Sequence, residues 1–365
     1  MTKKKWSDRL LWHAEGGSLN TIEFRDKSVV KSYTGEHVRG SEKLRQEHSW
    51  LRELPASVRR YFPRPLQYVE HGEPPQAELH LSRHEHLAIA KAILLDRLSH
   101  QRAADTVDTS LRTMLAEVYP LRTGTLSGIE LYETYHAPRL LRAIAALGHV
   151  PDVAEIVAAS AIYVNGSECP PFAALSEWLD VHAQRYFPDQ ARMVAGHGDL
   201  HLDNILASAT GPVELIFVDP RGDLLVPPHY DFAKMHKALT GYYDVIHYGR
   251  YEISVWSQAG AMHVNIEPDR AHDAHYEHAL EALLNTLPEY ADAEEVSVDT
   301  FRRSVALARL AHFISFAWYH ANHPQGCNVD RVSAFLAMSA LMARDLMLVG
   351  PDRAPNLERR LLTPN

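Results

Sequence analysis

The hydrophobic pattern of this chain changes near residue 84, and this change constrains the fold more than any other feature. Before it, short alternating runs predict β-strands, for example Thr21–Arg25 and Ser28–Tyr33 on either side of an Asp26-Lys27 turn. After it, apolar residues recur at helical spacing in long segments. We therefore expect an α+β fold with a small β-rich part at residues 1–83 and a larger, mainly helical part at residues 84–365.

The spacing of apolar residues also predicts individual elements. In the first part it predicts a helix at Ser41–Leu54 and further strands at Leu66–Glu70 and Glu78–Ser82. In the second part it predicts helices at Pro138–Leu147, Asp152–Val164 and Phe172–Tyr186. Within residues 197–219 a loop and short strands interrupt the helical pattern, which is typical of a functional site.

The composition is that of a globular protein, with 46% apolar and 23% charged residues in 365. The net charge of -9 is opposite in sign to a nucleic-acid-binding surface, so we expect no nucleic-acid polymer as partner. Two distant cysteines, Cys169 and Cys327, do not form a disulfide framework, and no long apolar run predicts a signal peptide or membrane span. We expect a cytoplasmic protein. Nothing in the sequence indicates an oligomeric state.

The most informative motif runs from His197 to Asn204, with the sequence His-Gly-Asp-Leu-His-Leu-Asp-Asn. Its Asp199 and Asn204 have the spacing of a kinase catalytic loop, and an apolar run that ends at Asp219 follows. One carboxylate can accept the proton of an attacking hydroxyl, while an amide and a second carboxylate supply oxygen ligands for Mg²⁺. An Asp and an Asn at this spacing also fit a simple turn, but Asp219 strengthens the kinase interpretation.

A buried ion pair is predicted in the first part of the chain. On the helix expected at Ser41–Leu54, Glu47 shares a face with Leu44 and Leu51 and therefore interrupts an apolar surface. A carboxylate directed inward needs a cationic partner, and Lys31 on the neighbouring strand is the natural candidate. The alternative is a glutamate exposed to solvent.

Together, Lys31, Glu47, Asp199, Asn204 and Asp219 resemble the aminoglycoside phosphotransferase and choline kinase superfamily. The resemblance covers about residues 16–246 and is strongest over residues 197–231. It implies a bilobal, protein-kinase-like fold and transfer of the γ-phosphate of ATP or GTP to a small-molecule hydroxyl. It further implies that Asp199 is catalytic, that Asn204 and Asp219 bind Mg²⁺, and that Lys31 with Glu47 positions the nucleotide phosphates.

The same resemblance implies roles for three other segments. Gly16, Gly17 and Ser18 would contact the nucleotide phosphates, although the segment is not a full G-x-G-x-x-G and a plain turn is the alternative. Backbone near residues 83–86 would form the hinge that holds the base. Asp231 would brace the catalytic loop without taking part in the chemistry.

Other classes of function fit less well. His197 and His201 stand four apart, as zinc ligands on a helix do, but the Gly198-Asp199 pair between them favours a loop. A protein kinase needs a long activation segment, whereas eleven residues separate Asp219 from Asp231. A catalytically silent, nucleotide-binding pseudokinase is the alternative outside the enzymes.

The sequence gives two indications about the acceptor. The segment from Asp219 to Gly222, Asp-Pro-Arg-Gly, resembles phosphotransferases of polysaccharide clusters and favours a sugar or a sugar-like metabolite. Arg221 could bind a phosphate or carboxylate there, or pair with Asp223. In contrast, ten acidic residues and one basic residue occupy Glu267–Asp299, which either line a pocket for an aminoglycoside or amino alcohol or form a solvated helical face.

Overall fold

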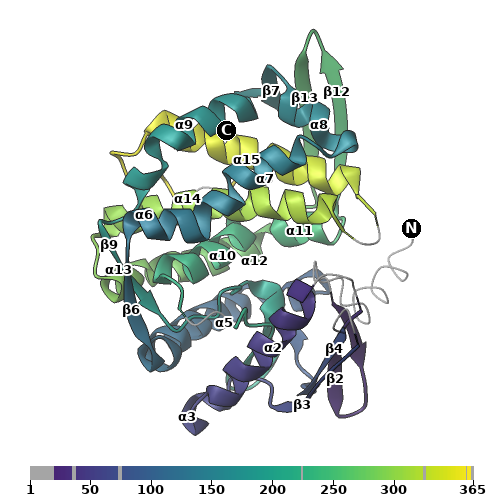
Figure 1. Ribbon diagram of the computed structural model, residues 1–365, viewed down its shortest axis with the longest axis vertical. Coiled ribbons are helices and arrows are strands. Elements are labelled where there is room, and N and C mark those ends of the chain that lie inside the picture. The colour runs from purple at the N-terminus through teal and green to yellow at the C-terminus, as the bar shows by residue number, and fades with distance from the viewer. Residues whose placement is uncertain are drawn as a thin grey trace. The chain divides into compact units, whose positions relative to one another are not determined.

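The structure is a computed structural model that describes residues 20–34, 38–72, 76–222, 225–323, 326–358 and 360–362. The chain forms two compact units (Figure 1). The first unit takes in the described residues up to Thr123 together with Val194–Val226, and the second comprises those of Gly124–Met193 and Pro227–Asn365. The prediction of an α+β fold is confirmed.

A four-stranded antiparallel sheet with the order β1-β2-β4-β3 begins the first unit. Its strands are β1 (Thr21–Phe24), β2 (Ser28–Tyr33), β3 (Pro65–His71) and β4 (Gln76–Ser82). The predicted turn joins β1 to β2 and is closed by a hydrogen bond from Arg25 N to Ser28 O of 2.8 Å. Helix α2 (Val38–Glu53) packs on this sheet and buries Leu44 and Leu51, as its apolar face predicts.

A second, three-stranded sheet in the first unit has the order β11-β10-β5. Its strands are β5 (Leu87–Ala88), β10 (Ile205–Ala207) and β11 (Leu215–Phe217). Antiparallel pairing sets Ile205 opposite Phe217, so the start of β10 lies beside the end of β11. Because Asn204 precedes β10 and Asp219 follows β11, this pairing brings the two predicted metal ligands to one end of the sheet.

Besides α2, the first unit contains further helical segments. They comprise α3 (Ala56–Arg59), α4 (Ile89–Leu94), α5 (His100–Thr113), a π-helical turn at Met114–Val118, and 3₁₀ turns at Tyr119–Leu121 and Leu202–Asn204. The predicted lobe boundary at residue 83 coincides with the end of β4, whereas the compact unit continues through these helices and takes in the second sheet. The boundary at residue 83 stays a prediction.

The second unit is mainly helical, as predicted. Its helices are α6 (Gly128–Leu131), α7 (Leu141–Leu147), α8 (Pro151–Ala158), α9 (Phe172–His182), α10 (Pro228–Thr240), α11 (Tyr243–His247), α12 (Asp273–Asn285), α13 (Leu287–Glu294), α14 (Val298–Ala321) and α15 (Val329–Val349), with turns at Tyr132–His136, Ala137–Arg139 and Ala183–Tyr186. Helix α14 packs against both α10 and α15, and these three helices contain much of the buried apolar core. The chain enters the second unit in strand β6 (Thr123–Ser127) and returns to the first at the end of strand β9 (Gln190–Val194), and these two strands pair with each other.

A small sheet in the second unit departs from the sequence-based expectation. Its strands, in the order β12-β13-β7-β8, are β12 (Tyr251–Gln258), β13 (Ala261–Pro268), β7 (Ala161–Val164) and β8 (Ser167–Cys169). The helix predicted at Asp152–Val164 is therefore wrong beyond Ala158. Ile162 and Val164 favour a strand locally, and β7 pairs with β13 from a distant part of the chain.

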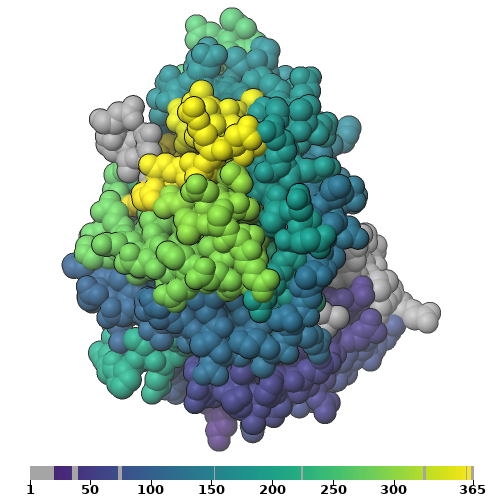
Figure 2. Space-filling model, turned by 90° about the vertical axis from the view of Figure 1, so that its left-hand side faces the viewer, coloured from purple at the N-terminus to yellow at the C-terminus, as the bar shows by residue number. Residues whose placement is uncertain are grey.

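Of the described helices, α15 is long and apolar enough to cross a membrane by length and composition. However, 72% of its most apolar stretch is buried inside the protein, as in a core helix. The chain that follows α15 continues over the face seen in Figure 2, where its residues are yellow. In this segment Asp352 forms an exposed ion pair, 2.6 Å long, with Arg185 of the turn after α9.

Buried histidines are a general feature of both units. Burial lowers the pKa of His136, His197, His236, His312 and His320. His236 lies on α10, is fully buried, and its Nε2 lies 2.8 Å from the carbonyl of Leu357, to which it donates a hydrogen bond when that nitrogen carries the proton. Burial lowers its pKa to about 3.

We expect acid to destabilise the protein between pH 6.5 and about 3. In this range the unfolded chain binds protons at histidines that stay neutral in the folded state, so the free energy of unfolding falls as pH falls. The substitution His236→Gln should reduce the slope of that free energy against pH by up to about 1.4 kcal/mol per pH unit. Urea unfolding at a series of pH values measures the slope. His149→Gln, at an exposed histidine, is the control, and equal slopes in both variants would contradict the prediction.

Candidate functional site

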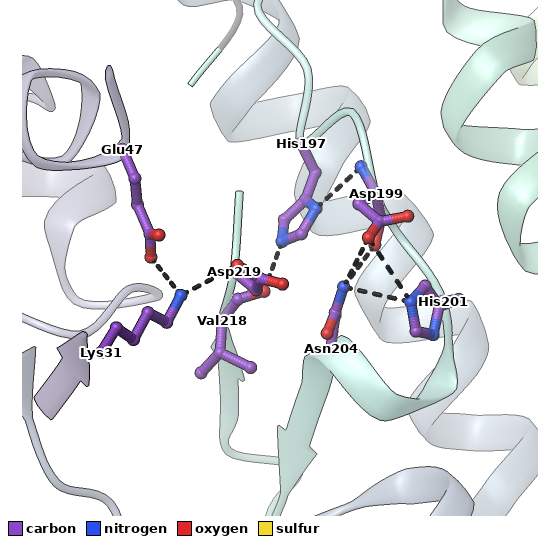
Figure 3. Close-up of polar contacts among 8 residues, drawn as sticks. All are labelled: Lys31, Glu47, His197, Asp199, His201, Asn204, Val218 and Asp219. Atoms are coloured by element: carbon purple, nitrogen blue, oxygen red, sulfur yellow. Dashed lines mark hydrogen bonds and ion pairs between the residues drawn. The ribbon is translucent and has the colours of Figure 1, made fainter. Parts of the chain in front are cut away.

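Lys31 joins three separate segments of the first unit (Figure 3). Its side chain projects from β2, and its Nζ lies 2.6 Å from Glu47 Oε1 on α2 and 2.9 Å from Asp219 Oδ1. Lys31 and Glu47 are almost completely buried, whereas the Asp219 side chain is 26% exposed. The predicted Lys31–Glu47 pair is present, and Asp219 is a second carboxylate on the same ammonium group.

Electrostatics keep Lys31 and Asp219 charged. Burial disfavours the charged form of Lys31, but the carboxylates of Asp219 and Glu47 outweigh it and raise the pKa of the ammonium. Burial also opposes ionisation of Asp219, yet the Lys31 charge holds its pKa well below the usual range. Burial raises the pKa of Glu47, which Lys31 partly counteracts. A protonated lysine therefore faces an ionised, partly exposed aspartate.

The backbone around Asp219 sets the direction of its carboxylate. Asp219 has a φ of 58°, in the left-handed region that few residues other than glycine adopt and that aspartate tolerates better than most. Three residues later, Gly222 has a φ of 72°, and a Cβ there would lie 2.8 Å from the backbone nitrogen of Glu47. A glycine at position 222 thus lets the loop after Asp219 approach helix α2 directly.

The catalytic-loop motif forms the other half of the site. Asn204 Nδ2 donates to the backbone carbonyl of Asp199 at 2.8 Å and lies 3.3 Å from Asp199 Oδ2. His201 Nε2 lies 3.2 Å from the same amide nitrogen and 3.7 Å from Asp199 Oδ2. These contacts fix Asp199 and Asn204 relative to each other.

The contacts of Asn204 through Nδ2 and of Asp219 through Oδ1 leave one further side-chain oxygen on each residue, and such oxygens suit a divalent cation. Since Nδ2 of Asn204 faces Asp199, its amide oxygen points away from that residue, as Figure 3 shows. Asp219 binds Lys31 through Oδ1 and has a second oxygen, Oδ2. An amide and a carboxylate oxygen match the preference of Mg²⁺ for few protein ligands together with phosphate oxygens. No group of three or more His, Cys, Asp or Glu that could hold a metal occurs in the part of the chain that the structure describes.

His197 connects the two halves, a role that its position in the sequence did not indicate. Its Nε2 lies 2.9 Å from the carbonyl of Val218, and its Nδ1 accepts the backbone N–H of Asp199 at 3.2 Å. Since Nδ1 accepts, Nε2 carries the proton and donates it. Burial lowers the pKa of His197 to about 4, so the ring is neutral at physiological pH and this pattern is maintained.

Arg221 also contributes to the loop structure. Its backbone N–H donates to the carbonyl of His197 at 2.9 Å. Gly198 has a φ of 77°, and a Cβ there would lie 3.0 Å from the Cβ of Arg221, so the arginine stem packs over the glycine. The alternative partner considered for its guanidinium, Asp223, lies outside the described residues.

The remaining predicted residues are placed as follows. Gly16, Gly17 and Ser18 lie outside the described residues. Residues 83–86 connect β4 to β5, and Arg83 N donates to Lys27 O at 3.1 Å, but their role as a hinge stays a prediction. Asp231 is buried on α10 of the second unit.

Several carboxylates of the acidic stretch are used structurally within the second unit. Glu294 is buried and its Oε1 lies 2.7 Å from His229 Nδ1. Asp269 pairs with Arg250 at 2.5 Å, and Asp273 pairs with Arg360 at 2.8 Å. Asp269 and Asp273 thus neutralise arginines of the same unit, whereas Glu277 and Glu281 of the same stretch line a pocket together with Arg302 and Arg360.

Comparisons with known proteins give similarities of fold. No family model and no curated protein matches the chain. A solved aminoglycoside-3'-phosphotransferase of type VIII is 16% identical with a TM-score of 0.45, over 78% of this chain and 84% of that one. An ethanolamine kinase from Plasmodium vivax is 14% identical with a TM-score of 0.46, over 91% of this chain and 80% of that one. An aminoglycoside phosphotransferase from Streptomyces rimosus, solved with ADP and streptomycin, is 16% identical with a TM-score of 0.39, over 78% of this chain and 99% of that one. These proteins are of the group that the sequence motifs resemble.

The buried ion pair supports a prediction about stability. Lys31→Met leaves the carboxylate of Glu47 buried without its cation, so we expect a loss of about 3–5 kcal/mol in the free energy of unfolding. The double variant Lys31→Met/Glu47→Leu removes the buried charge and should recover a large part of the loss. Urea denaturation measures both.

The control for this prediction is Arg122→Met, which breaks an ion pair with Glu53 between two exposed side chains 2.9 Å apart. It should change stability little, because solvent screens exposed pairs. A double variant no more stable than Lys31→Met alone would contradict the proposed energetic coupling of Lys31 and Glu47.

Proposed function

We propose that this chain is a small-molecule phosphotransferase that moves the γ-phosphate of ATP or GTP to a hydroxyl group. One observation carries the proposal: Lys31 binds both Glu47 and Asp219, residues from distant segments. In the same compact unit, Asn204 is tied to Asp199. This constellation supplies a cation for phosphate oxygens, two oxygen ligands for a metal and a carboxylate for proton transfer.

In the proposed reaction, the acceptor oxygen forms a bond to the γ-phosphorus while the bond from that phosphorus to the β,γ-bridging oxygen breaks. The electron pair of the broken bond leaves with the nucleoside diphosphate, and Asp199 accepts the proton of the acceptor hydroxyl. Lys31 offsets negative charge on the phosphate oxygens. Bound Mg²⁺, held by Asn204 and Asp219, would neutralise charge on the β- and γ-phosphates.

For the acceptor we propose a sugar or a sugar-like metabolite. The short connection between Asp219 and Asp231 provides little chain for docking a peptide, which favours a small acceptor. The pairing of Asp269 and Asp273 with arginines leaves fewer carboxylates of the acidic stretch for an aminoglycoside or amino alcohol, which are the alternative acceptors. A cytoplasmic location, where such acceptors and nucleotides are found, is part of the proposal, and the free thiols of Cys169 and Cys327 fit a reducing compartment.

The first test replaces the proposed base. Asp199→Asn removes proton acceptance and should lower the rate of phosphate transfer by about 10²–10⁴-fold while nucleotide binding is retained. Mass spectrometry of acceptors, which gain the mass of one phosphate, measures transfer, and calorimetry measures nucleotide binding. Asp203→Asn changes a carboxylate of the same loop and should keep most of the activity. Near-wild-type transfer by Asp199→Asn would rule out its assignment as the base.

The second test concerns the metal. Asp219→Ala should lose the increase in nucleotide affinity that Mg²⁺ provides, because that carboxylate would join the metal to the phosphates. The measurement is a titration of nucleotide with and without Mg²⁺ in wild type and variant. An identical effect of Mg²⁺ in both proteins would show that Asp219 is not a ligand. If the wild-type protein binds nucleotide but transfers phosphate neither to an acceptor nor to water, the pseudokinase alternative holds.

A further inference from the structure

Cationic side chains gather on one face of helix α10 inside the second unit. Lys234 and Lys237 follow Tyr230 by one and two helical turns, so these three side chains share a face. Helix α14 packs on α10 and presents His312, Phe316 and Tyr319 at the same spacing.

Aromatic rings bring three cations together. Lys234 Nζ and Lys237 Nζ lie 5.1 Å and 3.6 Å from the centroid of the Phe316 ring. Arg139 Cζ and Lys234 Nζ lie 5.4 Å and 6.0 Å from the centroid of the Tyr230 ring. Lys237 Nζ is also 3.3 Å from the Tyr243 centroid. The rings stabilise each cation, but three like charges so close together favour an anion among them.

His312 provides an independent indication of a ligand. It is fully buried, and neither of its ring nitrogens has a hydrogen-bond partner among the described residues. Burial and the nearby charges of Lys234, Arg139 and Lys237 lower its pKa well below the usual value. The ring is therefore neutral and carries one N–H that it can donate. Leaving such a group unsatisfied costs about 1–3 kcal/mol, so an acceptor atom is expected beside it.

Arg139 is the accessible member of the cluster. Its side chain is half-buried, and one guanidinium nitrogen, Nη1, donates to the carbonyl of Tyr135 at 2.6 Å. Within the described ranges Arg139 forms no ion pair. Two buried carboxylates of the same unit, Asp231 and Asp244, lie on α10 and α11. Tyr135 and Phe316 are also half-buried, which places the rim of the cluster at the surface of this unit.

We propose that Arg139, Lys234, Lys237 and His312 form a binding site for an anionic group, a phosphate or carboxylate, carried by a small molecule. An arginine fork and two ammonium groups bind oxyanions with charge-assisted hydrogen bonds, and the neutral histidine adds one donor. The site is inferred from residues of the second unit alone and does not depend on the proposed function. The cluster is unsuited to an aminoglycoside or choline, since both are cations.

Inorganic phosphate is the first probe. At constant ionic strength it should raise the thermal midpoint of the wild-type protein, and its affinity should be about tenfold or more weaker in Arg139→Gln and Lys234→Gln. Arg142→Gln removes an exposed arginine one turn further along and is the control. Arg139→Lys keeps the charge and should recover part of the affinity, which separates charge from a folding defect.

Two results would overturn the anion site. The first is equal phosphate affinity in wild type, Arg139→Gln and Lys234→Gln. The second is displacement of phosphate by a non-hydrolysable ATP analogue, which would place it at the nucleotide site. Glucose, glucuronate and glucose 6-phosphate then distinguish the source of the anion, because only the ligand with the correct group should bind more weakly to Arg139→Gln than to wild type.

Transfer assays distinguish a failure of the anion site from a failure of the proposed function. If phosphate binding depends on Arg139 but no acceptor is phosphorylated, the anion site stands and the phosphotransferase proposal fails. If neutral sugars are phosphorylated and both variants bind phosphate as wild type does, the phosphotransferase proposal stands and the anion site is refuted.

Discussion

The buried ammonium group of Lys31 is the interaction on which the first unit depends. It lies within hydrogen-bond distance of carboxylates on helix α2 and on the loop after β11, so strand, helix and loop are fixed at one point. A buried charge of this kind requires its partners, because each of the three groups would be costly to bury alone. The same requirement leaves Asp219 ionised and partly exposed, and only its Oδ1 is used in the bond to Lys31.

The second unit handles charge differently. Carboxylates such as Asp269 and Asp273 are paired with arginines of the same unit, whereas Arg139 has no carboxylate partner among the described residues. Aromatic rings lie against Arg139 and Lys234 beside His312. Thus the first unit offers a partly exposed carboxylate and the second a group of cations beside a buried histidine, and their proposed ligands differ accordingly.

Local patterns in the sequence predicted what depends on neighbouring residues. The apolar face of α2 identified Glu47 as inward-facing, and the spacing of Asp199 and Asn204 identified the loop. Contacts across long sequence distances were not accessible in this way. Three features depend on tertiary packing between distant segments, which local patterns do not encode: the contact of Lys31 with Asp219, the link from His197 to Val218, and the pairing of Ala161–Val164 with β13.

The first unit is discontinuous in sequence, since residues 124–193 leave it and the chain returns at Val194. Lys31 and Asp219 are 188 residues apart. During synthesis from the N-terminus, Lys31 and Glu47 therefore leave the ribosome long before Asp219 does, and the strands β10 and β11 do not yet exist. The nascent sheet and helix α2 have to wait for the returning segment, so this site is completed late in translation and depends on protection of the incomplete unit until then.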